Sequence, residues 1–73
     1  MKHPIRGLFY KSKSDGLWWV KDQTKHGGSF YKVYKETNKG LEWHKDADKY
    51  GNFIINKHKS DVGIFIPWKE LSK

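Results

Sequence analysis

The 73-residue sequence contains no cysteine, so disulfide bonds and thiolate zinc sites are both excluded. It has no apolar run that approaches the roughly 20 residues of a membrane-spanning helix. The first residues, Met1-Lys2-His3-Pro4, do not lead into the apolar stretch of a signal peptide. We therefore expect the chain to act in an aqueous, reducing compartment, or to be a segment cut from a longer protein.

Arginine is nearly absent, although the chain is strongly basic. Arg6 is the one arginine among 15 Lys and Arg side chains, and eight Asp and Glu leave a formal net charge of +7. Lysine is a compact point charge, whereas the guanidinium fork of arginine is better suited to reading base edges. The lysine-rich surface thus predicts attraction to nucleic-acid phosphates with little direct sequence readout. The alternative is a solvated surface that only keeps the protein soluble.

Aromatic side chains make up much of the apolar content: four Trp, four Tyr and four Phe. Each ring can bury roughly 150–250 Å², so a few of them can hold a small sheet together. A chain of 73 residues has room for one core. We expect a single domain over residues 1–73, in which residues 1–15 could be a less ordered N-terminal segment.

The order of residue types predicts a mainly β fold. Short aromatic and β-branched stretches, which favour strands, cover residues 17–21, 29–36, 41–46, 53–57 and 63–67. Thr37-Asn38-Lys39-Gly40 is a hairpin signal between two of them. Residues 4–10 could form a short helix or an edge strand, and residues 68–71 could form one helical turn. The expected fold is a single, highly twisted antiparallel sheet of four or five strands with at most a short terminal helix.

The hairpin at residues 37–40 predicts the register of the two longest strands. If Glu36 pairs with Leu41, the alternation of side chains places Leu41, Trp43 and Tyr34 in the core. The other expected pairs are Tyr34 with Trp43, Lys35 with Glu42, Val33 with His44, and Tyr31 with Asp46. The face away from the core would then carry a row of titratable side chains: Glu42, His44 and Asp46, with Lys35 and Tyr31.

Residues 43–51 place His44 and the carboxylates of Asp46 and Asp48 in this basic chain. RNA can be cleaved without a metal when a base takes the proton of the 2′-OH, an acid protonates the leaving oxygen and a cation stabilises the phosphate. Asp46 or Asp48 could supply the base, and Lys57, with Lys21, could hold the phosphate. The histidines that could exchange protons near neutral pH are His26, His44 and His58.

Each of these features also has a structural interpretation. Asp46 and Asp48 could open a turn by accepting hydrogen bonds from nearby backbone N–H groups. Lys57-His58-Lys59 could be solvated surface charge, His26-Gly27-Gly28 could be an ordinary loop, and the tryptophans could belong to the core. The sequence has no HExxH motif or other His-rich spacing, so no metal site is predicted.

Several stretches of the sequence, in a fixed order, resemble a known family. They are Leu17-Trp18-Trp19-Val20-Lys21-Asp22, His26-Gly27-Gly28-Ser29, Tyr31-Lys32-Val33-Tyr34, Asp46-Ala47-Asp48-Lys49-Tyr50-Gly51, Lys57-His58-Lys59 and Phe65-Ile66-Pro67-Trp68. Together they resemble the novel toxin 21 family of bacterial polymorphic toxins, over most of the chain. That family is similar to the ribosome-cleaving colicins, whose Asp-x-x-His-Gly motif corresponds here to Asp22-x-x-x-His26. Phe30 stands where the colicin motif has a glutamate.

The resemblance implies a toxin RNase domain at the C-terminus of a contact-dependent inhibition protein or a related secreted toxin. Such a domain is delivered as part of the larger protein and acts in the cytoplasm of the target bacterium. It would cleave 16S rRNA in the decoding-centre region without a metal or other cofactor. A cognate immunity protein, which we expect to be acidic, would neutralise it. The free chain would be a monomer, and this segment would not anchor it to a membrane.

The same resemblance makes Asp46, Asp48, Lys57 and His26 the candidate catalytic residues. The predicted RNA-binding residues are Lys21, Lys32, His44, Lys45, Lys49, His58 and Lys59. A second class of function fits the same composition: a non-catalytic RNA- or DNA-binding mini-barrel with a basic, aromatic face, like cold-shock or archaeal chromatin proteins. The carboxylates favour the nuclease, because a binder gains nothing from acids where phosphates must lie.

Overall fold

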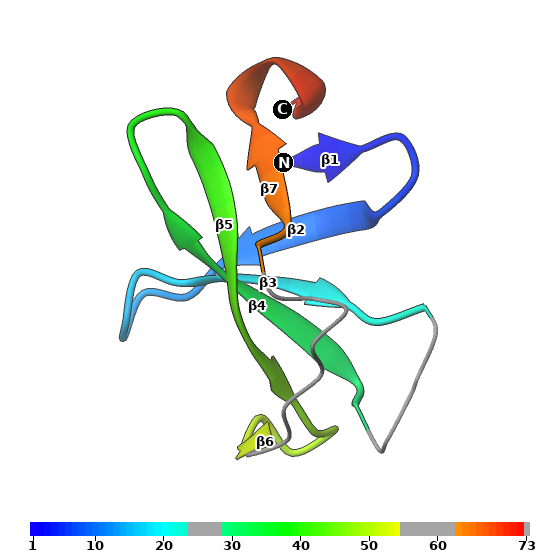
Figure 1. The fold of residues 1–73 in the computed structure, drawn as a ribbon. Helices are drawn as coiled ribbons and strands as arrows, with labels where there is room; N and C mark the ends of the chain where they lie inside the picture. The colour runs from blue at the N-terminus through cyan, green and yellow to red at the C-terminus, as the bar shows by residue number, and fades with distance from the viewer. Residues whose placement is uncertain (24–28, 55–62, 73) are drawn as a thin grey trace.

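The computed structural model describes residues 1–23, 29–54 and 63–72, which form one antiparallel sheet (Figure 1). Its elements are β1 (Lys2–His3), β2 (Gly7–Lys11), β3 (Trp18–Lys21), β4 (Tyr31–Glu36), β5 (Gly40–Ala47), β6 (Phe53–Ile54), β7 (Phe65–Pro67) and a 3₁₀ turn, η2 (Trp68–Glu70). Strands β1 to β6 pair in sequence order, and β7 pairs with β5. The predicted mainly β, antiparallel fold with a short terminal helical turn is confirmed.

The sheet has more strands than the four or five expected. Residues 1–15 contribute β1 and β2, and β2 pairs with β3 through Phe9 opposite Val20. Residues 7–11 therefore form a strand and not a helix, but β2 is not an edge strand, because β1 pairs with its other side. In addition, β5 is eight residues long, so its beginning pairs with β7 while its end pairs with β6.

The two ends of the described chain meet. The backbone N–H of Lys2 donates to the carbonyl of Ser72 over 2.6 Å, and the N–H of Ser72 donates back over 2.9 Å. Nearby, Nε2 of His3 lies 3.0 Å from Oε1 of Glu70. Because β7 already pairs with β5, this bridge closes the sheet on itself at that end, as Figure 1 shows. The sheet thus has an inner face, which surrounds the core, and an outer face.

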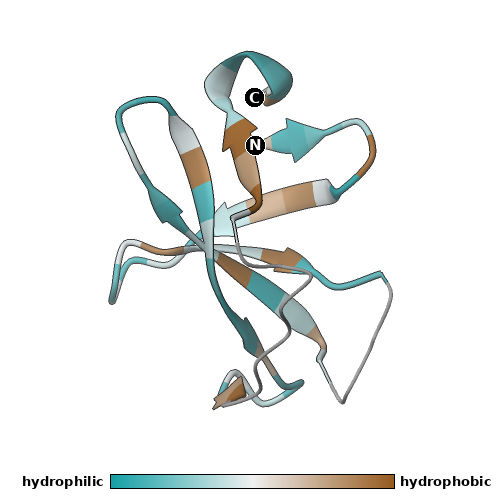
Figure 2. Ribbon diagram, in the orientation of Figure 1, coloured by the Kyte–Doolittle hydropathy of each residue, from teal (hydrophilic) through white to brown (hydrophobic). Residues whose placement is uncertain are grey.

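The core lies on the inner face, and strands β2, β3, β4, β5 and β7 each contribute one buried side chain. These are Phe9, Val20, Tyr34, Leu41 and Ile66, all at most 3% exposed. Figure 2 shows the hydrophobic stretches of β2, β5 and β7 in brown near the chain ends. The close contact of β5 with β7 requires glycine at position 40, because a Cβ there would overlap the carbonyl oxygen of Ile66.

The register of β4 and β5 contains a β-bulge. Near the hairpin the expected pairs form, with Glu36 opposite Leu41, Lys35 opposite Glu42 and Tyr34 opposite Trp43. Beyond Trp43 the register shifts, because β5 contains one extra residue, His44. The pairs that form there are Val33 with Lys45, Lys32 with Asp46, and Tyr31 with Ala47. The predicted pairs of Val33 with His44 and of Tyr31 with Asp46 are therefore wrong.

The bulge moves Asp46 to the other face of the sheet. Without it, alternation along β5 would place Asp46 on the outer face beside Tyr31. With it, Asp46 lies on the inner face opposite Lys32 and is 3% exposed. The predicted outer row of Glu42, His44 and Asp46 therefore does not form.

The helical element in the described part of the chain, η2, is three residues long. No helix within residues 1–23, 29–54 and 63–72 has the length and apolar character needed to span a membrane.

Candidate functional site

Three charged side chains meet on the inner face, where β3 ends, β4 begins and β5 ends. Asp22 follows β3, Lys32 lies in β4 and Asp46 lies in β5. The Nζ atom of Lys32 lies 3.7 Å from Oδ2 of Asp22 and 3.8 Å from Oδ1 of Asp46. The side chains of Asp22 and Asp46 are 1% and 3% exposed, and that of Lys32 is 16% exposed. We refer to Asp22, Lys32 and Asp46 as the ion cluster.

Local structure fixes the position of Asp46 within the ion cluster. The bulge at His44 turns its side chain inward, and the indole Nε1 of Trp43 donates a hydrogen bond of 3.0 Å to its Oδ1. Two carboxylates and one ammonium give the cluster a formal charge of −1, in a chain whose net charge is +7. Buried carboxylates are expensive unless they are paired and hydrogen-bonded, so this arrangement is a specific feature of the fold.

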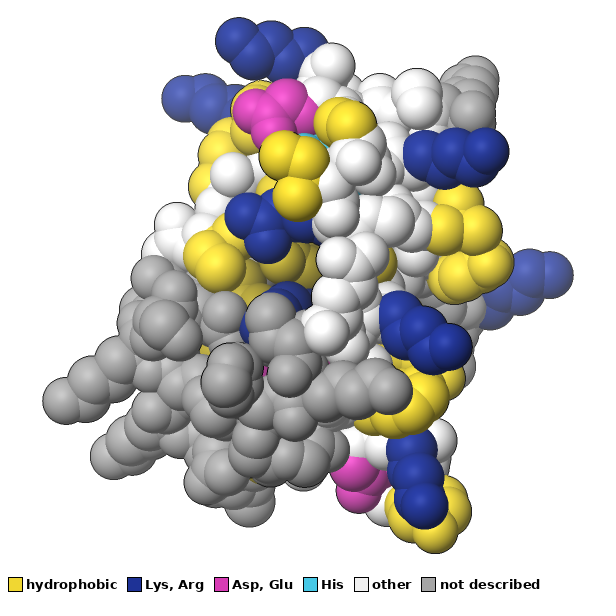
Figure 3. Space-filling model, turned by 90° about the vertical axis from the view of Figure 1, so that its right-hand side faces the viewer, with side chains coloured by type: hydrophobic (Ala, Val, Ile, Leu, Met, Phe, Trp, Pro, Cys, Tyr) yellow, Lys and Arg dark blue, Asp and Glu magenta, His cyan; other side chains and the backbone are white. Residues whose placement is uncertain are grey.

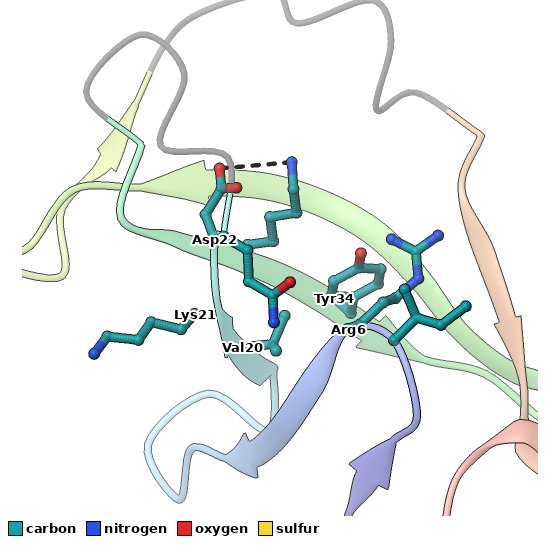
Figure 4. A pocket seen from close by; sticks show the side chains of 8 residues that line it. Arg6, Val20, Lys21, Asp22 and Tyr34 are labelled. Atoms are coloured by element: carbon teal, nitrogen blue, oxygen red, sulfur yellow. Dashed lines mark ion pairs between the residues drawn. The ribbon is translucent and has the colours of Figure 1, made fainter.

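A cleft of about 140 Å³ opens beside the ion cluster. Its lining includes Arg6, Val20, Asp22, Gln23, Lys32 and Tyr34. Figure 4 shows the carboxylate of Asp22 and the guanidinium of Arg6 reaching the cleft from different elements, with the Tyr34 ring between them. Lys21 also belongs to the lining, although its side chain runs away from Asp22 and Arg6 in the same view.

The cleft combines groups that complement a phosphodiester. Lys32 and Arg6 are cations that can face phosphate oxygens, and the carboxylate of Asp22 can accept a proton. The mouth of a closed sheet is also a common position for ligand sites. The arrangement is therefore suited to binding an anionic ligand and to taking a proton from it.

The structure places Asp48 in the turn after β5 instead. Its Oδ1 accepts hydrogen bonds from the backbone N–H groups of Tyr50, at 2.9 Å, and Asn52, at 3.0 Å. These are the contacts that the turn interpretation of Asp48 predicts. The structure thus places Asp46 in the buried ion cluster and Asp48 in a turn, although the sequence offers both as candidates for the base.

The other described lysines among the RNA-binding candidates lie outside the ion cluster, although Lys21 is one of the residues that line the cleft. Lys21 and Lys45 are exposed on the outer face, with Nζ 5.5 Å from the ring centre of Phe30 and 5.4 Å from that of Phe53. Lys49 is exposed, with Nζ 5.2 Å from the ring centre of Tyr50. Lys32 alone among these four lysines belongs to the ion cluster.

His44, the extra residue of the bulge, is half-buried, and its ring centre is 6.1 Å from that of Phe53. Partial burial lowers the pKa of His44 below its usual 6.5, and the charges of Lys35 and Lys45 add to this effect while that of Asp15 opposes it. His44 is therefore neutral at pH 7, where it can accept a hydrogen bond but adds no positive charge.

His26, Lys57, His58 and Lys59 lie outside the described residues, so their predicted roles stay predictions. Sequence reasoning did not select Asp22, Arg6 or Tyr34 as site residues. For Asp22 a signal was available, since it directly follows a strand and stands at the start of the Asp22-x-x-x-His26 spacing. Arg6 carries no such signal, because it reaches the cleft through the pairing of β2 with β3, and the sequence predicts Tyr34 only as a core residue.

Positive charge is spread over the surface. In Figure 3, dark blue Lys and Arg side chains project at many places, often beside yellow hydrophobic side chains, whereas magenta acidic side chains occupy small areas near the top and bottom of this view. A polyanion approaching this side would thus encounter a mainly cationic surface.

Comparisons of the chain with protein-family models, with curated proteins and with solved structures found no match. Within the described residues, no three His, Cys, Asp or Glu side chains gather as a metal site would require. The site is therefore interpreted from its own geometry.

Proposed function

We propose that this chain is an endoribonuclease domain of a bacterial toxin, which cleaves RNA without a metal ion. The observation that carries the proposal is the ion cluster, in which two carboxylates share one lysine beside a cleft that Arg6 also lines. A protein that only binds nucleic acid has no use for a net negative cluster there, because phosphates repel it. For proton transfer, the same cluster supplies both a proton acceptor and a cation.

The proposed reaction is an intramolecular transesterification. Asp22, which lines the cleft, accepts the proton of a ribose 2′-OH. The 2′-oxygen forms a bond to the adjacent phosphorus, and the bond from phosphorus to the 5′-oxygen of the next nucleotide breaks. Lys32 and Arg6 stabilise the charge on the phosphate oxygens. The products are a 2′,3′-cyclic phosphate and a 5′-OH, whose proton comes from an acid, for which His26 remains our sequence-based candidate.

Asp46 has a different role in this proposal from the one predicted for it. It is not among the residues that line the cleft, and it receives the Trp43 hydrogen bond while lying 3.8 Å from Lys32. Asp46 is thus a positioning residue that holds Lys32 beside Asp22. Asp48 accepts hydrogen bonds within the turn, so in this proposal it stabilises the fold and takes no part in the reaction.

The proposal retains the biological setting implied by the resemblance. The toxin would be delivered as part of a larger protein, would cleave 16S rRNA in the target cytoplasm and would be neutralised in the producing cell by an acidic immunity protein. A strongly cationic enzyme supports this last expectation, because opposite charge speeds the association of toxin and inhibitor.

The test uses the purified 73-residue chain with ribosomes and with total RNA, in buffer containing EDTA. We expect a discrete new RNA end carrying a 2′,3′-cyclic phosphate, mapped by sequencing. Asp22→Asn, which keeps the shape of the side chain, should lower the cleavage rate by about 10²–10⁴. Asp15→Asn is the matched control, because Asp15 is an exposed turn acid whose Oδ1 accepts a bond from Leu17 N; it should cleave at the wild-type rate.

Folding of each variant is checked by circular dichroism. RNA and ribosomes left intact by the wild-type chain would overturn the nuclease proposal and favour the non-catalytic binder. Equal cleavage by the Asp22→Asn and wild-type chains would instead show that the assigned site is wrong.

A further inference from the structure

The outer face of the sheet carries a group of aromatic side chains that the proposed reaction does not use. The strand register places two rows of residues across it. One row consists of Tyr10, Trp19, Val33 and Lys45, and the other of Lys21, Tyr31, Ala47 and Phe53. We refer to Tyr10, Trp19, Tyr31 and Phe53 as the aromatic platform.

Three rings of the aromatic platform, those of Trp19, Tyr31 and Phe53, are connected by contacts that Trp19 makes with the other two. The centroids of Trp19 and Phe53 are 5.9 Å apart, with the rings 22° from parallel. Tyr31 packs edge-on against Trp19 with its centroid 5.7 Å away. The small residues between the rings, Val33 and Ala47, are fully buried, so the rings close over them. These three rings thus form a packed surface in the folded chain.

Burial of Val33 and Ala47 explains why Trp19 is present, but it does not explain the whole platform. Tyr10 is 65% exposed and Phe53 is 40% exposed, so both leave much of their ring surface in water. A shallow depression of about 240 Å³ lies beside Tyr10, and its lining consists of Tyr10, Lys11, Ser12 and Trp19. Exposed rings grouped around a depression are typical of a binding surface.

Lysines stand at the edge of the aromatic platform. Lys45 Nζ is 5.4 Å from the ring centre of Phe53, and Lys21 occupies the same row as Tyr31. Both side chains are exposed. Rings that can stack on bases, placed among cations that can hold phosphates, form the usual combination for binding single strands. A duplex offers no free base faces to such a surface.

We propose that the aromatic platform binds a single-stranded segment of RNA, with unpaired bases stacked on Tyr10 and Phe53 and phosphates held by Lys21 and Lys45. This inference rests on the proposed function and adds its substrate class. Tyr31 and Phe53 of the platform lie at the same end of the sheet as the ion cluster but on the opposite face, since Tyr31 precedes Lys32 and Phe53 pairs with Ala47, which follows Asp46. A bound strand can therefore pass around that end from the platform to the cleft.

The test measures the binding of a fluorescent 2′-O-methyl RNA oligonucleotide, which lacks the attacking hydroxyl and cannot be cleaved. Tyr10→Leu and Phe53→Leu keep an apolar side chain but remove the π face, and each should weaken binding about fivefold or more. Tyr50→Leu is the control, because Tyr50 is 78% exposed but lies in the turn after β5; its affinity should be unchanged. Binding should also quench the fluorescence of Trp19, so most of the fluorescence change of the wild type should be absent from Trp19→Phe.

The lysines are tested through salt dependence. Lys45→Gln should reduce the slope of log affinity against log salt by about 0.7, whereas Lys39→Gln, in the distant hairpin, should leave it unchanged. Wild-type affinity in both Tyr10→Leu and Phe53→Leu would overturn the proposal, and so would equal affinity for the matched duplex. Absence of binding to any oligonucleotide at low salt would also overturn it and leave the platform as a surface for a protein partner.

The two proposals fail in different ways. Ring-dependent binding of the uncleavable strand without cleavage of natural RNA would refute the nuclease and leave the platform standing. If natural RNA is cleaved while the Tyr10→Leu and Phe53→Leu chains bind the oligonucleotide as the wild type does, the platform proposal is refuted and the nuclease proposal stands.

Discussion

The indole Nε1 of Trp43 donates a hydrogen bond of 3.0 Å to Oδ1 of Asp46, three positions further along β5. In a regular strand, side chains three positions apart point to opposite faces. The bulge at His44 removes this separation and turns both side chains toward the inner face. One extra residue in β5 thus creates both the buried carboxylate and its donor.

Trp43→Phe should therefore destabilise the protein, because it removes the donor to a buried carboxylate and retains most of the ring. A hydrogen bond to a charged group contributes roughly 1.5–3 kcal/mol, and we expect a loss of that order in the free energy of unfolding, measured with urea. Trp18→Phe is the control. The Nε1 of Trp18 donates over 2.9 Å to the exposed Glu36, so its loss should be smaller. Equal losses would contradict the assigned importance of the Trp43–Asp46 bond.

Lys32→Met should be more damaging, because it leaves the buried carboxylates of Asp22 and Asp46 without the cation between them. Removing one partner of a buried ion pair costs about 3–5 kcal/mol in the free energy of unfolding. Adding Asp46→Asn to Lys32→Met should recover part of that loss. A double-mutant cycle measures the coupling, which we expect to be about 0.5–3 kcal/mol. Additive losses would mean that Lys32 and Asp46 do not interact appreciably.

Much of the fold could be predicted from the sequence because local signals agreed with one another. The hairpin at Thr37-Asn38-Lys39-Gly40 gave the register of Tyr34 opposite Trp43, and the aromatic stretches marked β3, β4 and β7. The bulge could not be predicted, since Trp43-His44-Lys45 continues to read as an ordinary strand. A one-residue shift exchanges the two faces, so the error at His44 also misplaced Asp46.

The N-terminal residues were difficult to predict for another reason. The defined structure of these residues depends on long-range contacts, such as Lys2 with Ser72 and His3 with Glu70. Such contacts leave no periodic pattern in the sequence. Arg6 reaches the cleft in another way, because it directly precedes β2, which pairs with β3. This part of the candidate site therefore depends on a segment that local residue patterns left open between helix and strand.

The lowered pKa of His44 predicts a pH dependence of stability. Between that pKa and about 6.5 the unfolded chain binds a proton that the folded chain does not, so the free energy of unfolding falls as the pH is lowered through this interval. Above about pH 6.5 the group is neutral in both states and contributes no slope. The His44→Gln protein should lack this acid-dependent loss. The difference in free energy of unfolding between the variant and the wild type should therefore shift in favour of the variant as the pH is lowered from 7.5 to 5, by roughly the amount that the wild type loses through His44. Parallel pH profiles for the two proteins would contradict the burial of His44.

Gly40→Ala tests the contact between β5 and β7, through which the sheet closes on itself. A methyl group at position 40 would overlap the carbonyl oxygen of Ile66 and lie 2.8 Å from Cα of Pro67, and backbone atoms cannot rotate away as a flexible side chain can. We expect a loss of about 1–3 kcal/mol or more in the free energy of unfolding.

Gly51→Ala is the control: its φ of +84° adds backbone strain of about 1–2 kcal/mol, but its methyl group meets nothing within 4 Å. Hydrogen exchange distinguishes the two variants, because the strain in Gly51→Ala acts on a turn whereas the overlap in Gly40→Ala acts on the pairing of β5 with β7. Only Gly40→Ala should lower the protection of the Ile66 and Trp68 amides from exchange. Unchanged protection there would show that β7 does not depend on a bare backbone at position 40.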